Sequence, residues 1–322
     1  RCMTPTKLPP GLPGRFNFKG KILLGPGMTI HKKSLLDEIG ECKISPDRLC
    51  IDPNAMLISE EDKADEAKMR EEIASTASGS GAASARRIMG RSAIPPMLAG
   101  EDSDLQKYTE VRATFCGNAV EELERHYAAG KKILLEGTQG SGLSIFHGSY
   151  PHVTSRDTNV AGCLTEAGIS PKRVRRVIMV VRTTPIRVGN PDGGQHSSGR
   201  LKNETDFDTV ANEAGLNPDE VKKAEKTSTT KRDRRVGWFD WEQFRHACIL
   251  NTPTDIALTF VDYLSKDNQS ARRFEQLTQN TIKFIEELEH VAQAPVSIIN
   301  VRFPDMESDK DIRSMIDRRN WS

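Results

Sequence analysis

A short apolar run passes directly into a glycine-rich loop at Ile133-Leu-Leu-Glu136-Gly-Thr-Gln-Gly-Ser-Gly142. The apolar half predicts a buried strand, and residues 105–129 before it carry apolar residues at helical spacing that Gly130 terminates. A helix that feeds a strand, followed by a donor-rich loop, is typical of an open α/β sheet, where ligands bind outside the carboxyl ends of strands. A glycine-rich loop alone is a weak signal, because a generic tight turn explains it almost as well.

The same alternation continues along the chain in both directions. Further strands are predicted at 21–25, 177–181, 256–261 and 296–299, and further helices at 34–39, 60–72, 241–250, 270–291 and 309–316. Short apolar strands that alternate with helices indicate a mostly parallel central sheet covered by helices. We therefore expect an α/β fold in a single domain that spans residues 1–322.

Composition limits the classes of partner. With 46 basic and 45 acidic residues, the net charge is +1, so no overall field favours nucleic acid or an acidic membrane surface. No apolar run approaches the roughly 20 residues that span a bilayer. The six cysteines are scattered without a C-x-x-C pair, which predicts neither a zinc knuckle nor a disulfide framework and favours the reducing cytoplasm. The chain begins at Arg1, so we expect the numbering to start inside a longer protein.

The loop after residue 136 contains the groups that a purine nucleotide needs. The amide of Gln139 offers an acceptor and donors and can read the edge of a base. Thr154, Ser155 and Arg156 add hydroxyl donors and a cation, as a phosphate site requires.

A small-residue segment at 73–84 has two interpretations. It is either a flexible Gly/Ser linker or a loop whose amides and hydroxyls hold a phosphate. The residues alone leave both open.

A basic loop at 226–235 precedes the apolar run Val236-Gly-Trp-Phe239. A solvated charge run is the default interpretation, but the apolar run anchors the loop close to the core. A guanidinium held in this way is suited to bidentate binding of a carboxylate. Asp233 within the run, and the lack of interleaved aromatics, argue against a nucleic-acid patch.

Several ordered motifs resemble the adenylosuccinate synthetase family. They are Glu136-Gly-Thr-Gln-Gly140, Gly148-Ser-Tyr-Pro-His-Val-Thr-Ser155, Arg187-Val-Gly189 and Thr229-Thr-Lys-Arg-Asp-Arg-Arg-Val-Gly-Trp238. They are similar to the family's E-G-x-Q-G, H-G-T-Y-P-Y-V-T-S, T-R-V-G and T-T-G-R-R-R-R-x-G-W. The resemblance runs from about Leu8 to near the C-terminus, and it implies a fold related to the P-loop NTPases.

The resemblance also implies the residues of each subsite. The acceptor purine nucleotide would contact Ser75, Thr76, Arg91, Gln139, Thr154, Val188 and Arg232, with Arg91 supplied by the second subunit of a homodimer. L-aspartate would contact Thr229, Thr230, Arg232 and Arg234. The base of the nucleoside triphosphate would meet Phe260 and Asp262.

The implied reaction joins L-aspartate to the C6 position of a 6-oxopurine nucleoside monophosphate. A nucleoside triphosphate, ATP or GTP, first phosphorylates the 6-oxygen with Mg²⁺, and the amine of aspartate then displaces phosphate. Donors, a cation and the metal stabilise charge on the phosphoryl oxygens. The product is a succinyl-aminopurine nucleotide.

This chain departs from the family in two regions. The opening G-D-E-G-K-G-K loop with its catalytic carboxylate, and the N-A-G-H-T histidine region, have no counterpart, so we expect the catalytic residues in a segment before Arg1. The alternative is a catalytically degraded homologue that acts as a nucleotide-binding interaction or regulatory protein. The family's guanine-reading T-K-x-D is Thr259-Phe-Val-Asp262 here, which weakens the expectation of GTP and admits ATP.

The compact length resembles the archaeal type and the phage 2-aminoadenylosuccinate synthetases. The segment Pro185–Gly194 is similar to the phage form, which uses dGMP in place of IMP. The sequence leaves IMP, GMP and dGMP open as acceptors.

Overall fold

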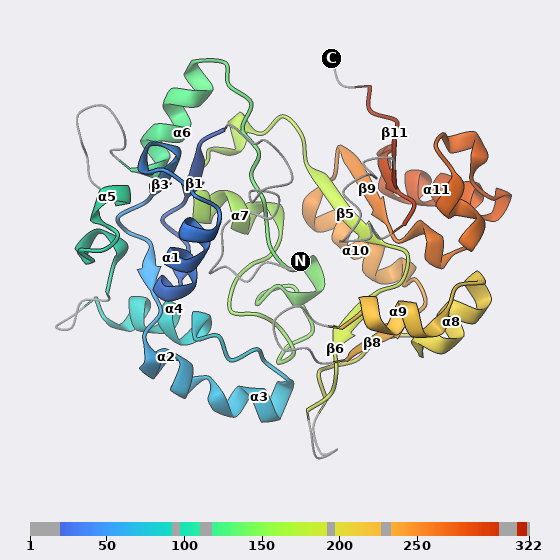
Figure 1. Ribbon diagram of the computed structural model, residues 1–322, viewed down its shortest axis with the longest axis horizontal. Helices are drawn as coiled ribbons and strands as arrows, with labels where there is room; N and C mark the ends of the chain where they lie inside the picture. Colours follow the sequence, from blue (N-terminus) through green and yellow to red (C-terminus); the bar gives the residue numbers. More distant parts are fainter. Residues whose placement is uncertain are drawn as a thin grey trace. The chain divides into compact units, whose positions relative to one another are not determined.

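The computed structural model describes residues 20–91, 97–109, 118–191, 197–226, 233–302 and 314–320. The chain divides into two compact units, residues 1–173 and 174–322, and each unit has its own hydrophobic core (Figure 1). That the chain forms a single domain stays a prediction.

The first unit contains two pairs of parallel strands among helices. Its strands are β1 (Ile22–Leu24), β2 (Thr29–Ile30), β3 (Leu49–Ile51) and β4 (Met56–Leu57), and β1 pairs with β3 while β2 pairs with β4. Its α-helices are α1 (Lys32–Glu41), α2 (Glu60–Asp65), α3 (Ala67–Ile73), α4 (Ser80–Met89), α5 (Gln106–Thr109), α6 (Ala119–Ala128) and α7 (Val160–Ala167). Strand β3 is buried at every position, as parallel strands covered on both faces are.

The second unit contains a four-stranded sheet in the order β11-β10-β9-β5 and a three-stranded antiparallel sheet in the order β6-β8-β7. Its strands are β5 (Ile178–Arg182), β6 (Ile186–Val188), β7 (Glu204–Thr205), β8 (Arg234–Gly237), β9 (Asp255–Thr259), β10 (Val296–Asn300) and β11 (Met315–Asp317). Its α-helices are α8 (Phe207–Ala214), α9 (Pro218–Ala224), α10 (Trp241–Asn251) and α11 (Gln279–Ala292). The predicted α/β class with parallel strands is confirmed.

Strands β5, β9 and β10 run parallel, and only β11 is antiparallel in this sheet. Residues from β9 and β10 form a core cluster with Phe244 of α10 and with Ile285 and Leu288 of α11, so both helices pack on the sheet. Helix α10 begins where the sequence predicts, because the carboxylate of Asp240 accepts hydrogen bonds from the amides of Glu242 and Gln243.

The carboxyl ends of β5 and β9 lie side by side. Arg182 is opposite Thr259 in the register, and the Thr183 amide donates to the Thr259 carbonyl at 3.2 Å. The Thr183 hydroxyl donates to the carbonyl of Phe260 at 2.6 Å. The segments that follow the two strands therefore begin at one edge of the sheet, where ligands bind in this fold class.

The strand predicted at 133–136 is wrong. These residues have no regular secondary structure, and Leu134 is 84% exposed. A strand needs a neighbour to satisfy its backbone amides and carbonyls, and no described strand pairs with this run. Its apolar composition alone was therefore misleading.

The helix predicted at 270–291 begins late, at Gln279, after two 3₁₀ turns. The cause is the buried side chain of Asn268. Its amide donates to the Val261 carbonyl and to the Thr281 hydroxyl, both at 2.9 Å, while its oxygen accepts from the Thr278 amide at 3.0 Å. Such side-chain bonds compete with helix hydrogen bonds and favour a turn.

The C-terminal helix predicted at 309–316 is also not supported where the structure describes it. Residues 303–313 lie outside the described part of the chain, and Met315–Asp317 forms strand β11. Cys42, Cys163 and Cys248 are free, whereas the fully buried Cys50 is disulfide-bonded, which the scattered spacing did not predict. In the described part of the chain, no helix has the length and apolarity to cross a membrane.

Replacing Asn268 should destabilise the second unit strongly. The substitution Asn268→Ala removes three hydrogen bonds and leaves the buried Val261 carbonyl without this donor, so we expect a loss of about 2–3 kcal/mol in the free energy of unfolding. Urea unfolding measures it. The matched control is Gln243→Ala on the exposed surface of α10, which should change stability by less than about 0.5 kcal/mol. Equal effects of the two substitutions would contradict this role of Asn268.

Candidate functional site

The structure brings together the two residues that the sequence analysis assigned to the base and the phosphate of a nucleotide. The side-chain amide of Gln139 donates to the hydroxyl of Thr154 at 3.0 Å, although 15 residues separate them. Gln139 is exposed, with φ of 62°, and Thr154 is half-buried. A non-glycine residue in this left-handed region is uncommon and often marks a functional loop.

The loop that joins these residues is held in shape by internal bonds. The Ser144 hydroxyl donates to the Asp157 carboxylate at 2.7 Å and accepts from the amides of Phe146 and His147. A Cβ atom on Gly148 would lie 2.6 Å from the carbonyls of Gly142 and Ser144, so only glycine fits there. The loop is therefore set in one conformation before any ligand binds.

The small-residue segment at 73–84 is not a linker. Helix α4 begins within it at Ser80, and Ala83 is fully buried. The amides of Gly79, Gly81 and Ala82 donate to the carboxylate of Glu66, at 2.7, 2.5 and 3.0 Å.

The carboxylate of Glu66 therefore accepts the amide hydrogen bonds that the phosphate interpretation expected a bound phosphate to accept. The backbone amides at the start of α4 are used internally, which leaves the hydroxyls as the donors of this segment. Thr76 is exposed, while the Ser75 hydroxyl accepts from the Ala77 amide at 3.1 Å.

The two candidate phosphate segments nevertheless lie next to each other. A Cβ atom on Gly81 would be 3.1 Å from the Cβ of Ser155, so the start of α4 packs against the Thr154–Ser155 turn. Residues assigned to the acceptor nucleotide from distant parts of the sequence therefore occupy one region of the first unit.

Arg156, the cation that the sequence interpretation gave to this phosphate region, is engaged in an ion pair within the first unit. Its guanidinium donates to Glu166 at 2.8 Å, and its side chain is only 10% exposed. Burial raises the pKa of Glu166, an effect that Arg156 opposes. Arg156 is committed to an internal ion pair.

Arg91 lies just past the far end of α4. Its Nε donates to the carbonyl of Ile88 at 2.8 Å, and it lines a shallow hollow of about 420 Å³ with Arg87, Ile88 and Leu98. Helix α4, about 15 Å long at 1.5 Å per residue, separates Arg91 from the segment that contains Thr76. Within one chain, Arg91 is therefore remote from this segment.

In the second unit, the antiparallel pairing of β6 and β8 places Val188 opposite Arg234. The sequence analysis assigned Val188 to the purine nucleotide and Arg234 to L-aspartate. Arg234 is half-buried, and its Nη1 donates to the carboxylate of Glu225 at 2.9 Å. The other residues assigned to aspartate, Thr229, Thr230 and Arg232, lie outside the described residues.

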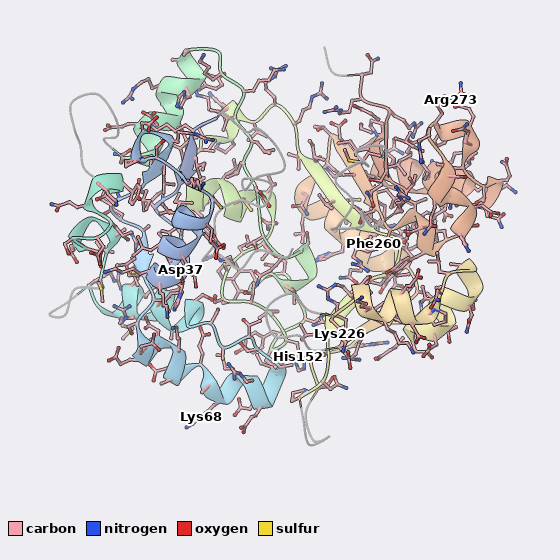
Figure 2. All side chains as sticks on the ribbon, in the orientation of Figure 1. Asp37, Lys68, His152, Lys226, Phe260 and Arg273 are labelled. Atoms are coloured by element: carbon pink, nitrogen blue, oxygen red, sulfur yellow. The ribbon has the colours of Figure 1, made fainter. Side chains whose placement is uncertain are left out.

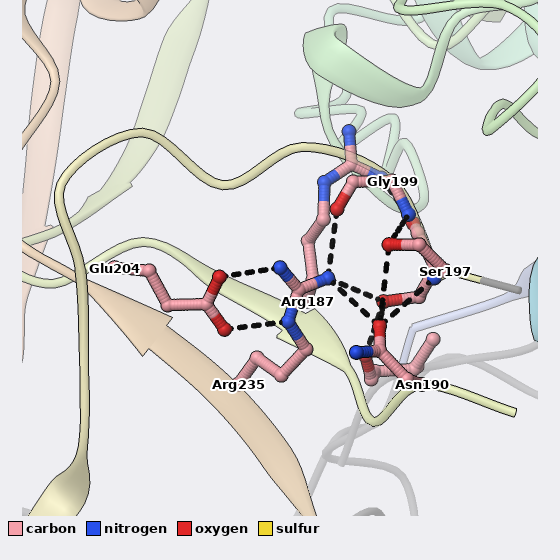
Figure 3. Close-up of polar contacts among 8 residues, drawn as sticks. Arg187, Asn190, Ser197, Gly199, Glu204 and Arg235 are labelled. Atoms are coloured by element: carbon pink, nitrogen blue, oxygen red, sulfur yellow. Dashed lines mark hydrogen bonds and ion pairs between the residues drawn. The ribbon is translucent and has the colours of Figure 1, made fainter. Parts of the chain in front are cut away.

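Arg235 anchors strand β8 (Figure 3). Its guanidinium forms two hydrogen bonds with the carboxylate of Glu204, at 2.6 and 2.5 Å. The same guanidinium donates to the Asn190 side chain, the Ser198 hydroxyl and the Gly199 carbonyl. Arg235 therefore ties β8 to both ends of the loop that follows β6.

Phe260 follows β9 at the edge where the strands end (Figure 2), and Asp262 lies in the turn after it. Phe260 has φ of 61°, and the guanidinium of Arg182 lies 3.6 Å from its ring centroid. Asp262 is 4% exposed; its Oδ2 accepts from Gln269 at 3.3 Å, whereas its Oδ1 is buried without a hydrogen-bond partner. Burial raises the pKa of this carboxyl to about 6. A buried acceptor without a donor is costly.

The described residues offer no dedicated metal cage. No group of three or more His, Cys, Asp or Glu side chains among them could hold an ion. Mg²⁺ is usually held by substrate phosphates with one or two carboxylates. No step of the reaction is therefore assigned to a metal bound by these residues.

Comparison with known proteins agrees with this arrangement. The family model of adenylosuccinate synthetase matches residues 97–270. The adenylosuccinate synthetase of Methanocaldococcus jannaschii is 32% identical over 309 residues, which cover 94% of this chain and 81% of that protein. That of Methanococcus aeolicus is 31% identical and covers 95% of this chain and 83% of that protein. The chain belongs to the adenylosuccinate synthetase family.

Solved structures give the same fold. The succinoaminodeoxyadenylate synthetase of cyanophage S-2L, bound to dGMP and dATP as an energy donor, has a TM-score of 0.68 and 25% identity, and the match covers 88% of this chain and 74% of that chain. The adenylosuccinate synthetase of Plasmodium falciparum has a TM-score of 0.73 at 22% identity, covering 93% and 85%. The protein is a ligase that joins aspartate to a purine nucleotide with the use of a nucleoside triphosphate.

Sequence reasoning missed three glutamates that organise these segments. Glu66 and Glu225 lie in or beside charged helices, where a solvated face is the default interpretation, and Glu166 lies in α7. Their partners are 9 to 43 residues away in sequence, so spacing gives no signal for them.

The buried carboxyl of Asp262 predicts a stability that depends on pH. Because folding raises its pKa from 3.8 to about 6, the folded state binds this proton more tightly, and this contribution to stability is present below pH 3.8 and lost as the pH rises through about 6. The substitution Asp262→Asn removes the buried charge, so we expect a gain of about 2–3 kcal/mol over the wild type above pH 7.

Urea unfolding between pH 5 and 8 measures this gain. The difference between Asp262→Asn and wild type should shrink as the pH falls below 6. The exposed Asp208→Asn serves as the control, with no comparable gain at pH 8. A constant difference across the range would show that the charge of Asp262 is not the cause.

Proposed function

We propose that this chain joins L-aspartate to the C6 position of a 6-oxopurine nucleoside monophosphate and uses a nucleoside triphosphate with Mg²⁺. The product is a succinyl-aminopurine nucleotide. The observation that carries the proposal is the 3.0 Å hydrogen bond between Gln139 and Thr154, because it joins a group able to read a purine edge to a donor for a 5′-phosphate.

The acceptor nucleotide is proposed to contact the residues that the sequence motifs assign to it. Gln139 contacts the base, the hydroxyls of Ser75, Thr76 and Thr154 bind the 5′-phosphate, and Val188 lines the ribose. Arg232 is assigned to the ribose and to aspartate. The nearness of Gly81 to Ser155 supports a shared phosphate site for the two hydroxyl-bearing segments.

Aspartate is proposed to bind through Thr229, Thr230, Arg232 and Arg234. Arg234 supports this assignment because only one of its nitrogens is used by Glu225, and a guanidinium has further donors for a two-point contact with a carboxylate. Its position opposite Val188 keeps the aspartate side close to the ribose side within the second unit.

For the phosphoryl donor, we propose ATP rather than GTP. Phe260 carries no donor for the 6-oxygen of guanine, and one face of its ring is covered by Arg182. The unpartnered Oδ1 of Asp262 can accept from an amino group of the base. The phage synthetase bound to dATP as an energy donor supports this choice by its similarity.

The acceptor is proposed to be IMP, GMP or dGMP, and assay decides among them. The archaeal relatives are adenylosuccinate synthetases, whereas the phage structure holds dGMP. We place the reaction in the cytoplasm, where nucleotide substrates are present.

The direct test is an absorbance assay of the full-length protein with L-aspartate, Mg²⁺ and each pairing of IMP, GMP or dGMP with ATP or GTP. We expect aspartate-dependent product with one of the monophosphates and a higher kcat/KM for ATP than for GTP. Absence of product with every pairing, from folded protein, would refute the proposed function.

The variant Gln139→Ala tests the base contact. We expect the KM for the purine monophosphate to rise by about 10- to 100-fold, the effect of losing the hydrogen bonds of this amide to the base, while the KM for aspartate changes little. Steady-state kinetics measures both constants, and Gln243→Ala is the control outside the site. An unchanged KM for the monophosphate would remove Gln139 from the site.

We further propose a homodimer in which Arg91 of one subunit serves the phosphate of the other. The length of α4 between Arg91 and the Thr76 segment supports this arrangement, because a single chain holds them apart.

Complementation between inactive variants tests this shared site. Arg91→Ala and Gln139→Ala are each expected to have low activity at limiting monophosphate. After the two are mixed and allowed to exchange subunits, about a quarter of the sites should contain neither substitution, and activity should recover to that fraction. No recovery, although native mass spectrometry shows mixed dimers, would place Arg91 and Gln139 in the site of the same subunit or remove Arg91 from it.

A further inference from the structure

A buried carboxylate stands at the centre of the second unit's candidate residues. Glu225, just after α9, is 2% exposed and accepts three hydrogen bonds: from Arg182 Nη2 at 2.7 Å, Arg234 Nη1 at 2.9 Å and the Tyr263 hydroxyl at 2.9 Å. Burial opposes its ionisation, but Arg182 and the three donors hold the pKa of Glu225 below its usual value. Glu225 is therefore a fixed negative charge.

The three donors come from three different segments. Arg182 ends β5, Arg234 begins β8, and Tyr263 lies in the turn after β9. Arg182 also stacks on Phe260, at 3.6 Å from the ring centroid. Through these contacts, Glu225 touches both the segment assigned to the triphosphate base and the arginine assigned to aspartate.

We propose that Glu225 is a positioning residue that sets the guanidinium of Arg234 for aspartate and couples it to the triphosphate-base segment. This role rests on the proposed function. With Nη1 on Glu225, the direction of the remaining N–H groups of Arg234 is fixed, so a substrate carboxylate meets donors that are already oriented.

The charges of the cluster agree with this role. Among the groups in direct contact with Glu225, one carboxylate faces two guanidinium groups, so both arginines share a single negative charge. The charge of Glu225 contributes to raising the pKa of Asp262. A change at the triphosphate-base segment therefore acts on the cluster around Glu225.

A purely structural role is the competing explanation. A buried ion cluster gives little net stability, because desolvation offsets the attraction between the charges. A purely structural role predicts a change in the Tm alone, whereas a positioning role predicts a change in the KM for aspartate. Measuring both quantities therefore distinguishes the two roles. Glu122 is a matched reference: it is 3% exposed and paired with Lys21 and Arg125, but it lies in the first unit among residues with no assigned substrate contact.

The experiment compares Glu225→Gln with Glu122→Gln in the full-length protein. Glutamine keeps the shape and one acceptor while it removes the charge. For Glu225→Gln, we expect the KM for aspartate to rise about tenfold or more and the KM for ATP about threefold, with kcat and the KM for the monophosphate changed by less than about threefold. Glu122→Gln should lower the Tm without changing any KM.

Tyr263→Phe provides a second test that keeps both ion pairs. It removes one hydrogen bond from Glu225, and we expect the KM for aspartate to rise about two- to threefold although Tyr263 is outside the aspartate loop. Glu225→Asp, which restores a carboxylate, should recover part of the aspartate affinity lost in Glu225→Gln. If Glu225→Gln does not fold, Tyr263→Phe decides alone.

An aspartate KM within the error of wild type, in folded Glu225→Gln or otherwise in Tyr263→Phe, overturns the positioning role. So does an equal rise in Glu122→Gln. A wild-type enzyme that forms no aspartate-dependent product overturns the proposed function and this role together, whereas an active enzyme with unchanged aspartate KM overturns this role alone.

Discussion

The parallel pairing of β5 with β9 is the constraint on which the second unit's chemistry depends. Because Arg182 lies opposite Thr259, both strands end at the same level, and the segments after them start from one edge. The bonds from Thr183 to Thr259 and Phe260 then fix the left-handed turn at Phe260. A shift of this register by one residue would turn Arg182 to the other face of the sheet and away from Glu225.

Glutamates perform a similar task in both units. Glu66 takes the amides at the start of α4, Glu166 takes the charge of Arg156, and Glu225 takes one nitrogen of Arg234. In each case, a donor that looks available in the sequence is partly or wholly used inside the protein. The groups that remain for substrates are therefore fewer than the composition of the loops suggests, and they are better oriented.

Positive φ at non-glycine residues occurs in these segments as well as elsewhere in the described chain. Ala77, Gln139 and Phe260 adopt positive φ without being glycine, and each lies in a segment assigned to a substrate. Such conformations cost of order 1 kcal/mol each and persist where the surroundings hold them. The surroundings here include the Ser75 bond at Ala77 and the Thr154 bond at Gln139.

The sequence by itself determined the α/β class, most strands and helices, and the family, because apolar periodicity and ordered motifs are local properties of a chain. It also predicted that Gln139 and Thr154 serve the same nucleotide, and the structure joins the two side chains by a hydrogen bond. It failed at 133–136, where apolar residues lack a paired strand, and at 270–278, where Asn268 ends the helical pattern. Only the tertiary structure decided which donors are occupied, since Glu66, Glu166 and Glu225 act through folding contacts that no sequence spacing encodes.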